Sequence, residues 1–369
     1  MKITLSKIPS VVRKLNLSTE VELGDQIAPE EGAVIVVEAL EDQGKNNVLD
    51  FASGRLGRLV EGDVIAAALG KRRALREYSG DIPKQVKPGD ILYLLCESGL
   101  VGEIAGLNES WGKPMQARVL GSVIRNGKPL NIRDAAIPWH TRLEKSAPII
   151  AVVGTCMDIG KTTTICKLVK HFKRQGLRVA AAKLAGVAFL QDPLKIKDAG
   201  ADPVIDFVDA GLPSTCGDAK NVVQAALGVL HEVNQSAPDV IVAEFGDGIL
   251  GEYNVNHLLQ HPDIQKHIRT VIVGASDFVA AWGAKQIMQQ YGLGIDLITG
   301  PAVNNETGAA FIEKNLGIAA ESNLHATPKT LRLVEERLFG VESLPVSSKR
   351  AVLPIYSRAW AEAAPVAVP

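Results

Sequence analysis

The chain has 369 residues, of which 46% are hydrophobic, and its formal net charge at pH 7 is −1. This length and composition predict a folded globular protein with room for two domains. Because basic and acidic residues nearly balance, the composition gives no support to a nucleic-acid partner. We expect the partners to be a small-molecule substrate and further copies of the chain, in a homo-oligomer such as a homodimer.

The sequence predicts neither a signal peptide nor a membrane span. The N-terminal stretch "MKITLSKIPSVVRKL" alternates charged and apolar residues, and no stretch approaches eighteen uncharged apolar residues. Four cysteines lie far apart without a Cys-x-x-Cys pair, which argues against a disulfide framework and a zinc site. They are Cys96, Cys156, Cys166 and Cys216. These features predict a cytoplasmic location.

Residues 1–145 form short apolar runs broken by turn signals, which is typical of a smaller, mostly-β domain. Two segments, 59–70 and 85–99, each place Gly-Asp before an apolar run, and this similarity suggests paired hairpins in a barrel or a sandwich. The polar segment 131–148, bracketed by prolines, is the candidate linker, and we expect it to be exposed. The role of this first domain does not follow from its sequence.

From residue 148 to residue 338, predicted strands alternate with predicted helices. This alternation indicates a P-loop NTPase-like α/β domain, in which a parallel sheet carries helices on both faces. The expected strands cover 149–153, 176–186, 239–245, 270–276 and 294–300. The expected helices cover 162–176, 219–235, 279–291, 306–316 and 327–338. Residues 339–369 form a C-terminal tail rich in alanine and proline, which we expect to be partly disordered.

The stretch "GTCMDIGKTTT" (154–164) joins the first of these strands to the first helix. In a P-loop, backbone N–H groups and the helix N-terminus bind phosphate. Lys161 would then reach the β- and γ-phosphates, and the Thr162 hydroxyl would bind Mg²⁺. Five residues separate Gly154 from Gly160, where the usual motif has four, so Thr155 takes the usual first-glycine position. The predicted nucleotide-binding residues are Gly154, Thr155, Asp158, Gly160, Lys161, Thr162 and Thr163. The alternative is an ordinary helix N-terminus.

Two further charged residues lie at the ends of predicted strands, where open α/β sheets bind ligands. Glu244 ends an apolar strand and is predicted to bind the metal or the substrate, with Asp247 as a weaker candidate. Lys183 interrupts another strand and is predicted to act in catalysis with Lys161 and Glu244. The alternatives are an exposed strand-end carboxylate and a lysine that reaches solvent at the sheet edge.

The sequence also suggests the nucleotide and a possible anion site. No Asn-Lys-x-Asp follows the later strands, which favours ATP over GTP. The basic run "GKRRALR" (70–76) could hold an anion, although a solvated charge cluster is the favoured interpretation.

Three short motifs within Ile149–Glu321 carry a family resemblance. "GTCMDIGKTTT", the strand end "AAKLAG" and "AEFGDG" resemble the phosphate loop, the lysine strand and the glutamate strand of dethiobiotin synthetases. The first and third motifs, with "VIDFVDAG" (204–211), are similar to those of the DUF1611 family of P-loop proteins, some of which are described as N-acyltransferases of D-amino acids. The resemblance implies phosphate-site roles for Thr155, Lys161 and Thr162, and catalytic or metal-binding roles for Lys183, Asp206 and Glu244. Cys156 stands where dethiobiotin synthetases have aspartate, and Phe245 and Asp247 replace smaller neighbours of their glutamate.

The resemblance implies an ATP- and Mg²⁺-dependent enzyme of the ligase type. It would phosphorylate a carboxylate-like group of a small amino-acid-like substrate, and an amine would then attack the mixed anhydride. One alternative is an N-acyltransferase that uses an acyl-CoA. Another is a nucleotide-driven switch or a chaperone that delivers a cofactor or metal.

Overall fold

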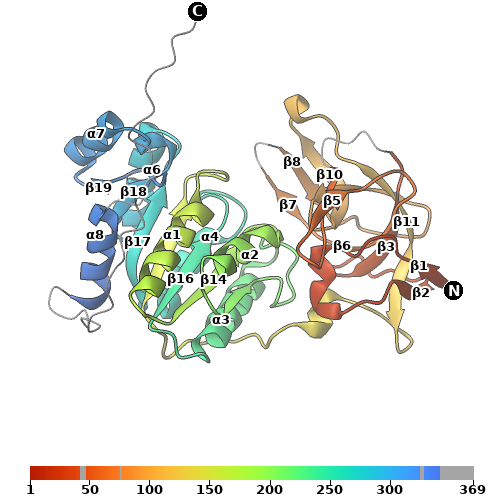
Figure 1. The fold of residues 1–369 in the computed structure, drawn as a ribbon. Coiled ribbons are helices and arrows are strands. Elements are labelled where there is room, and N and C mark those ends of the chain that lie inside the picture. Colours follow the sequence, from red (N-terminus) through yellow and green to blue (C-terminus); the bar gives the residue numbers. More distant parts are fainter. Residues whose placement is uncertain (42–46, 75–76, 325–327, 341–369) are drawn as a thin grey trace, which may run out of the picture.

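A computed structural model of the chain describes residues 1–41, 47–74, 77–324 and 328–340 (Figure 1). Figure 1 shows two domains side by side, a β domain that contains the N-terminus and an α/β domain that follows it. The predicted tail begins one residue too early, because Phe339 is the last residue of a helix, and the part of the tail from residue 341 onward lies outside the described residues.

The α/β domain is built on a seven-stranded sheet in which every neighbouring pair is parallel. The order of its strands is β15-β14-β16-β13-β17-β18-β19. The strands are β13 (Ile149–Gly154), β14 (Val179–Ala185), β15 (Val204–Asp206), β16 (Val240–Phe245), β17 (Ile268–Gly274), β18 (Leu297–Thr299) and β19 (Ala319–Ala320). Since β13 lies in the middle, the loop that follows it opens at the centre of one sheet edge.

Helices cover both faces of this sheet, as predicted (Figure 1). Successive side chains of a strand point to opposite faces. Ile150 and Val152 pack with α1 (Lys161–Arg174), α2 (Gln191–Asp198) and α8 (Pro328–Phe339). Ile149, Ala151 and Val153 pack on the other side with α3 (Ala219–Asn234), α4 (Val255–Gln260) and α6 (Phe278–Gln290). The short α5 (Pro262–Gln265) and α7 (Glu306–Leu316) complete the helices of this domain.

The β domain contains a closed barrel. Its strands pair around a ring in the order β11, β3, β6, β10, β9 and back to β11. They are β3 (Val34–Ala39), β6 (Val64–Leu69), β9 (Ile91–Cys96), β10 (Leu100–Leu107) and β11 (Gln116–Arg125). The remaining strands are β1 (Lys2–Thr4), β2 (Glu20–Gly24), β4 (Val48–Asp50), β5 (Leu56–Arg58), β7 (Arg72–Arg73), β8 (Tyr78–Asp81) and β12 (Lys128–Pro129). Of the two predicted architectures, the barrel is therefore confirmed.

The two similar Gly-Asp turns have the same local geometry. The Asp63 carboxylate accepts a hydrogen bond from the N–H of Val60, and the Asp90 carboxylate accepts one from the N–H of Lys87. Each turn leads into a barrel strand, β6 or β9. The repeated Gly-Asp pair thus marks the turn that precedes each of these two barrel strands.

The segment 131–148 is polar and is exposed only in part, because several of its residues contact the α/β domain. Leu143 is only 1% exposed, and the indole N–H of Trp139 donates to the carbonyl of Ala210 over 2.7 Å. Arg142 forms an ion pair with Asp263. The connection is therefore fastened along the α/β domain by packing and hydrogen bonds.

The two domains share one continuous apolar core. Leu130 and Ile132 of the β domain belong to the same cluster of buried side chains as Phe207 and Leu212 of the α/β domain. This shared core holds the two domains together, with a cavity between them.

Candidate functional site

The loop from residue 155 to residue 160 joins β13 to α1 and has the geometry of a P-loop. Gly160 adopts a φ of +86°, and a side chain there would collide with the amide of Asn323. That amide donates to the carbonyls of Ile159 and Gly160 over 3.3 and 3.2 Å. The first N–H groups of α1 have no carbonyl partners within the helix, so they are available to an anion.

Gly154 and Thr155 shape the beginning of the loop. A side chain at Gly154 would collide with Ile159, so this glycine allows the loop to pack closely on its own strand. The hydroxyl of Thr155 accepts a hydrogen bond from the N–H of Ser276, which ties the loop to the turn after β17. Both residues therefore support the loop conformation.

Lys161 is the first residue of α1, and its side chain lies inside the loop rather than in solvent. The residue is 7% exposed, and its Nζ donates to the carbonyls of Cys156 and Asp247 over 2.9 and 2.8 Å. Burial lowers the pKa of this lysine, while the carboxylates of Glu244 and Asp247 oppose that shift. Neutral carbonyl groups thus hold the Lys161 ammonium at the loop. A negatively charged phosphate oxygen would form a stronger, charge-assisted hydrogen bond with it.

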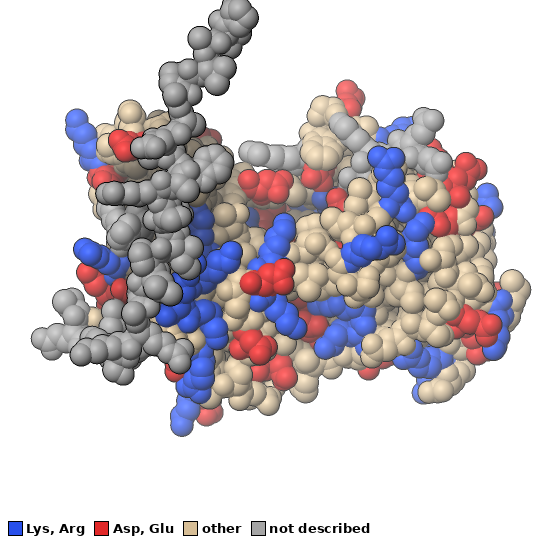
Figure 2. All heavy atoms as spheres, viewed as in Figure 1, with Lys and Arg blue, Asp and Glu red and all other residues tan. Residues whose placement is uncertain are grey.

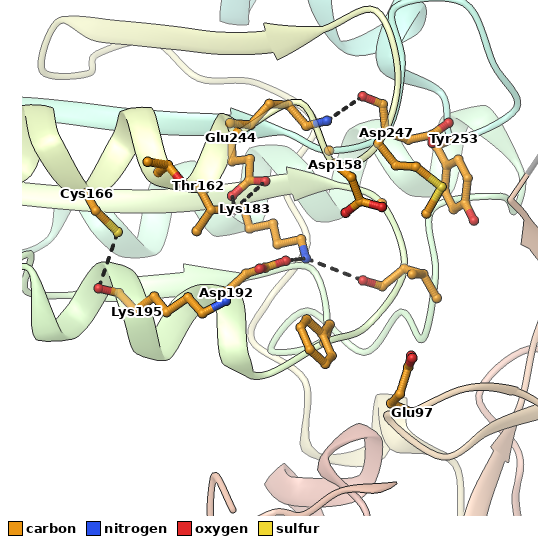
Figure 3. Close-up of a pocket in the computed structure, with 18 of the residues that line it drawn as sticks. Glu97, Asp158, Thr162, Cys166, Lys183, Asp192, Lys195, Glu244, Asp247 and Tyr253 are labelled. Carbon is orange, nitrogen blue, oxygen red and sulfur yellow. Dashed lines mark hydrogen bonds and ion pairs between the residues drawn. The ribbon is translucent and has the colours of Figure 1, made fainter. Parts of the chain in front are cut away.

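Thr162, in the first turn of α1, faces Glu244, which lies near the end of β16. Glu244 pairs with Val152 in the register of β16 and β13, and its carboxylate oxygens lie 3.3 and 3.4 Å from the Thr162 hydroxyl (Figure 3). Glu244 is 3% exposed. Burial raises its pKa, Asp192 adds to the shift, and the ammonium groups of Lys183 and Lys161 oppose it. The alternative of an exposed strand-end carboxylate is therefore wrong.

A hydroxyl and a carboxylate are hard oxygen ligands of the kind that Mg²⁺ prefers, so Thr162 and Glu244 fit this ion. Within the described ranges, no group of three or more His, Cys, Asp or Glu side chains could hold a metal. Mg²⁺ at nucleotide sites usually has few protein ligands because phosphates and water supply the others.

Asp206, which the resemblance implies as a metal ligand, is engaged elsewhere. Its carboxylate lies 2.6 Å from the guanidinium of Arg13, which comes from the short helix Ser10–Leu15 of the β domain. It also accepts hydrogen bonds from the N–H groups of Val208 and Asp209. The structure thus places Asp206 in a buried contact between the domains, away from the residues that line the cavity with Thr162 and Glu244.

Lys183 supplies a second buried ammonium to the site. It lies on β14 and is only 5% exposed, so the alternative of a lysine that reaches solvent is wrong. Its Nζ is 2.6 Å from the carboxylate of Asp192 (Figure 3). Burial opposes its charge, but Asp192 and Glu244 more than compensate, and its pKa is raised. Lys183 therefore stays protonated.

Lys161, Thr162, Lys183 and Glu244 line a cavity of about 870 Å³ to which both domains contribute, whereas Gly154, Thr155 and Asp206 are not among its lining residues. Such a volume is typical of a small-molecule site. Asp158 and Thr163, both exposed and both predicted to bind nucleotide, lie on its wall with Gly160, Lys161 and Thr162. Figure 2 shows basic and acidic side chains intermixed on the face of the molecule. Within the cavity the basic residues are Arg72, Lys161, Lys167, Lys170, Lys183 and Lys195.

The β domain forms the opposite wall of the cavity. Its contributions are Arg72, Glu77, Cys96 and Glu97. Arg72 is 3% exposed and pairs with Glu77, and Arg73 pairs with Asp81 and Glu252. The interpretation of this run as a solvated charge cluster is therefore wrong for Arg72 and Arg73, while Arg76 lies outside the described residues.

The strand, loop and helix define the class of this protein as a P-loop α/β protein, here with a β-barrel domain. In the described part of the chain, no helix is both long and apolar enough to cross a bilayer.

No protein-family profile and no curated protein matches the sequence. Among solved structures, the chain is similar to the signal recognition particle receptor FtsY from Elizabethkingia anophelis, with 17% identity and a TM-score of 0.36. That similarity covers 52% of this chain and 66% of the receptor chain, just under two thirds of it. FtsY from Thermotoga maritima shares 18% identity with a TM-score of 0.37, over 54% of this chain and 71% of that one. The signal recognition particle 54 kDa protein from Aeropyrum pernix, solved in complex with GDP, shares 17% identity with a TM-score of 0.35, over 53% and 47%.

Proposed function

We propose that this protein is an ATP- and Mg²⁺-dependent enzyme of the ligase type, acting on a small amino-acid-like substrate. One observation carries the proposal: a buried glutamate is hydrogen bonded to the P-loop threonine and lies close to two buried lysines. Lys161, Lys183 and Glu244 are 7%, 5% and 3% exposed, and Thr162 is hydrogen bonded to Glu244. Charged side chains are seldom so buried unless they are paired or functional.

The reaction would proceed in two steps. A carboxylate oxygen of the substrate attacks the γ-phosphorus of ATP, the bond to the β–γ bridging oxygen breaks, and ADP leaves. An amine then attacks the carbonyl carbon of the acyl phosphate, the C–O bond to phosphate breaks, and the nitrogen loses a proton. Lys161 and Lys183 would stabilise the negative charge that develops on the transferred oxygens. Bound at Thr162 and Glu244, Mg²⁺ would supply further charge neutralisation.

The choice of ATP rests on the missing Asn-Lys-x-Asp signature. We expect Mg·ATP to bind more tightly than Mg·GTP in a calorimetric titration. Equal affinities would remove the preference for ATP while leaving the phosphate site intact, whereas no binding of either nucleotide would refute both.

One assay separates ligase from acyltransferase chemistry. The protein is incubated with Mg·ATP or with acetyl-CoA and a panel of amino acids, and the release of ADP, phosphate and free CoA is followed. We expect amino-acid-dependent release of ADP and phosphate. Release of CoA without ADP would instead establish the acyltransferase alternative. Nucleotide hydrolysis that no amino acid stimulates would favour the switch.

A further inference from the structure

One residue of the cavity has no part in the reaction described above. Arg72, on β7 of the β domain, is 3% exposed and lines the cavity on the wall opposite the P-loop. A guanidinium keeps its charge even when it is buried, so a position of this kind requires compensating contacts.

The guanidinium of Arg72 is fixed in place but incompletely paired. One terminal nitrogen donates to the carbonyl of Leu95 and the other pairs with Glu77, while the group lies over the ring of Tyr78 at 5.0 Å. Its Nε is buried and has no hydrogen-bond partner among the described residues. A buried donor without an acceptor is unfavourable, and such groups are rare in native proteins. A carboxylate that displaced the contacts over this nitrogen from the cavity side would supply the missing acceptor.

Arg72 is also close to the centre of the proposed reaction. The carbonyl of Asp247 accepts the hydrogen bond of Lys161 over 2.8 Å. Burial raises the pKa of the Asp247 carboxyl group, and both Lys161 and Arg72 oppose that shift. Lys161, Arg72 and Asp247 all line the same cavity, so a molecule bound at Arg72 would share that cavity with the phosphate loop.

The charges around Arg72 select the kind of anion. The carboxylates of Glu77, Glu97 and Asp247 line the cavity with Arg72, and Glu77 is its ion-pair partner. Figure 3 shows Glu97 below the α/β-domain side chains, and its carboxylate accepts a hydrogen bond from the thiol of Cys96 over 3.4 Å. These carboxylates repel a polyphosphate but tolerate a single carboxylate, which a guanidinium binds well. They would also attract an ammonium group.

We propose that Arg72 binds the carboxylate of a small amino-acid-like zwitterion, whose ammonium group lies near Glu97 and Asp247. The β domain would then bind the acceptor substrate and the α/β domain the nucleotide. The identity of the bound zwitterion as a substrate rests on the proposed function, whereas the binding itself does not.

The binding can be tested without turnover by NMR. Protein with ¹⁵N-labelled arginine is titrated with three probes, 4-aminobutyrate, butyrate and 4-aminobutanamide, and the Nε–H resonance of Arg72 is followed. Its assignment comes from its loss in Arg72→Lys. We expect a saturating shift with 4-aminobutyrate, a shift at higher concentration with butyrate, and none with the amide, which lacks the negative charge.

Calorimetry on variants supplies the matched comparison. Arg72→Lys keeps the charge but loses the planar donor, so 4-aminobutyrate should bind on the order of tenfold more weakly. Arg73→Lys is the control, because Arg73 is adjacent in sequence but forms ion pairs with Asp81 and Glu252 instead of lining the cavity. It should bind the probe like the wild type. Glu97→Gln should reduce the preference for 4-aminobutyrate over butyrate.

The outcomes separate this inference from the proposed function. A resonance that no carboxylate moves, that the amide moves equally, or that only Mg·ATP moves would overturn the assignment of Arg72. Mg·ATP is titrated into the same variants, and unchanged nucleotide affinity shows that Arg72→Lys is folded. If the carboxylates bind but no nucleotide does, the proposed function fails and the zwitterion site stands.

Discussion

The two walls of the cavity are built in different ways. On the α/β side, the charged groups lie where the architecture places them, at the ends of parallel strands and at the start of the helix after β13. On the β side, Arg72, Glu77 and Glu97 come from a short strand, a neighbouring loop and the end of a barrel strand.

This difference indicates a division of labour between the walls. A phosphate group is bound mainly by backbone N–H groups and one lysine, so its site follows from the fold. Recognition of a particular small molecule needs side chains arranged for it, and these can come from any element that borders the cavity. We therefore assign nucleotide binding to the first wall and substrate selection to the second.

The largest expected effect concerns the contact that joins the walls. The guanidinium of Arg13 lies 2.6 and 3.0 Å from the carboxylates of Asp206 and Asp209. In Arg13→Ala the carboxylate of Asp206 would remain buried without its ion-pair partner, while Asp209 would keep only Lys14, 3.6 Å away. This should lower the free energy of unfolding by about 3–5 kcal/mol. Urea denaturation measures this loss. The control is Arg118→Ala, whose partner is Glu38 on the surface and whose loss should be at most about 1 kcal/mol. Similar losses in the two variants would mean that the domains do not depend on this contact.

The next effect concerns catalysis at the α/β wall. Glu244→Gln removes a charge and keeps the shape, so turnover should fall about a hundredfold to a thousandfold while the melting temperature changes little. Asp239→Asn is the control, because Asp239 precedes the same strand at its opposite end and pairs with Arg178. Its turnover should match that of the wild type. Wild-type turnover in Glu244→Gln would refute the role of this residue, and it would leave the α/β wall with nucleotide binding alone.

Nucleotide binding itself should depend on Lys161. Lys161→Ala removes a charge-assisted contact worth about 1.5–3 kcal/mol, so Mg·ATP should bind roughly tenfold to a hundredfold more weakly. Lys173 lies on the same helix but is exposed and does not line the cavity, which makes Lys173→Ala the matched control in calorimetry. Equal affinity in both variants would show that the loop is structural.

The sequence predicts the regular parts of the molecule well because their periodicity is strong. The helix expected at 306–316 is α7, and the strand expected at 239–245 is β16. The sequence did not predict β15 and α2. Both lie in a segment rich in aspartate, glycine and proline, where turn signals mask short elements. A three-residue strand has too few positions to show alternation.

The candidate site divides in the same way. Lys161, Thr162, Lys183 and Glu244 are brought together because parallel strands end at one edge of the sheet. Asp192, the partner of Lys183, belongs to the missed helix α2, and Arg72 meets the cavity only through the docking of the two domains. Asp206 is a residue to which the sequence motif gives a role that its contacts do not support. The motif implies a metal ligand, but the partner of Asp206 is Arg13, which lies far away in the sequence. No local pattern reveals contacts of this kind.

The smallest expected effect is a dependence on pH that belongs to the α/β wall alone. Burial, together with Asp192, raises the pKa of Glu244 above its ordinary value of 4.5, and Lys183 and Lys161 oppose that shift. Mg²⁺ binds the ionised carboxylate, so its binding releases a proton from the protonated form. The contribution of Glu244 to Mg²⁺ binding is therefore complete above the raised pKa. It is lost as the pH falls through that pKa, by up to about tenfold in affinity for each pH unit below.

Because ATP also titrates, the quantity to measure is the ratio of Mg·ATP affinities of wild type and Glu244→Gln. This ratio should fall toward one as the pH is lowered, and it should begin to fall above pH 4.5. A ratio that stays constant down to that pH would show that Glu244 acts without binding the ion.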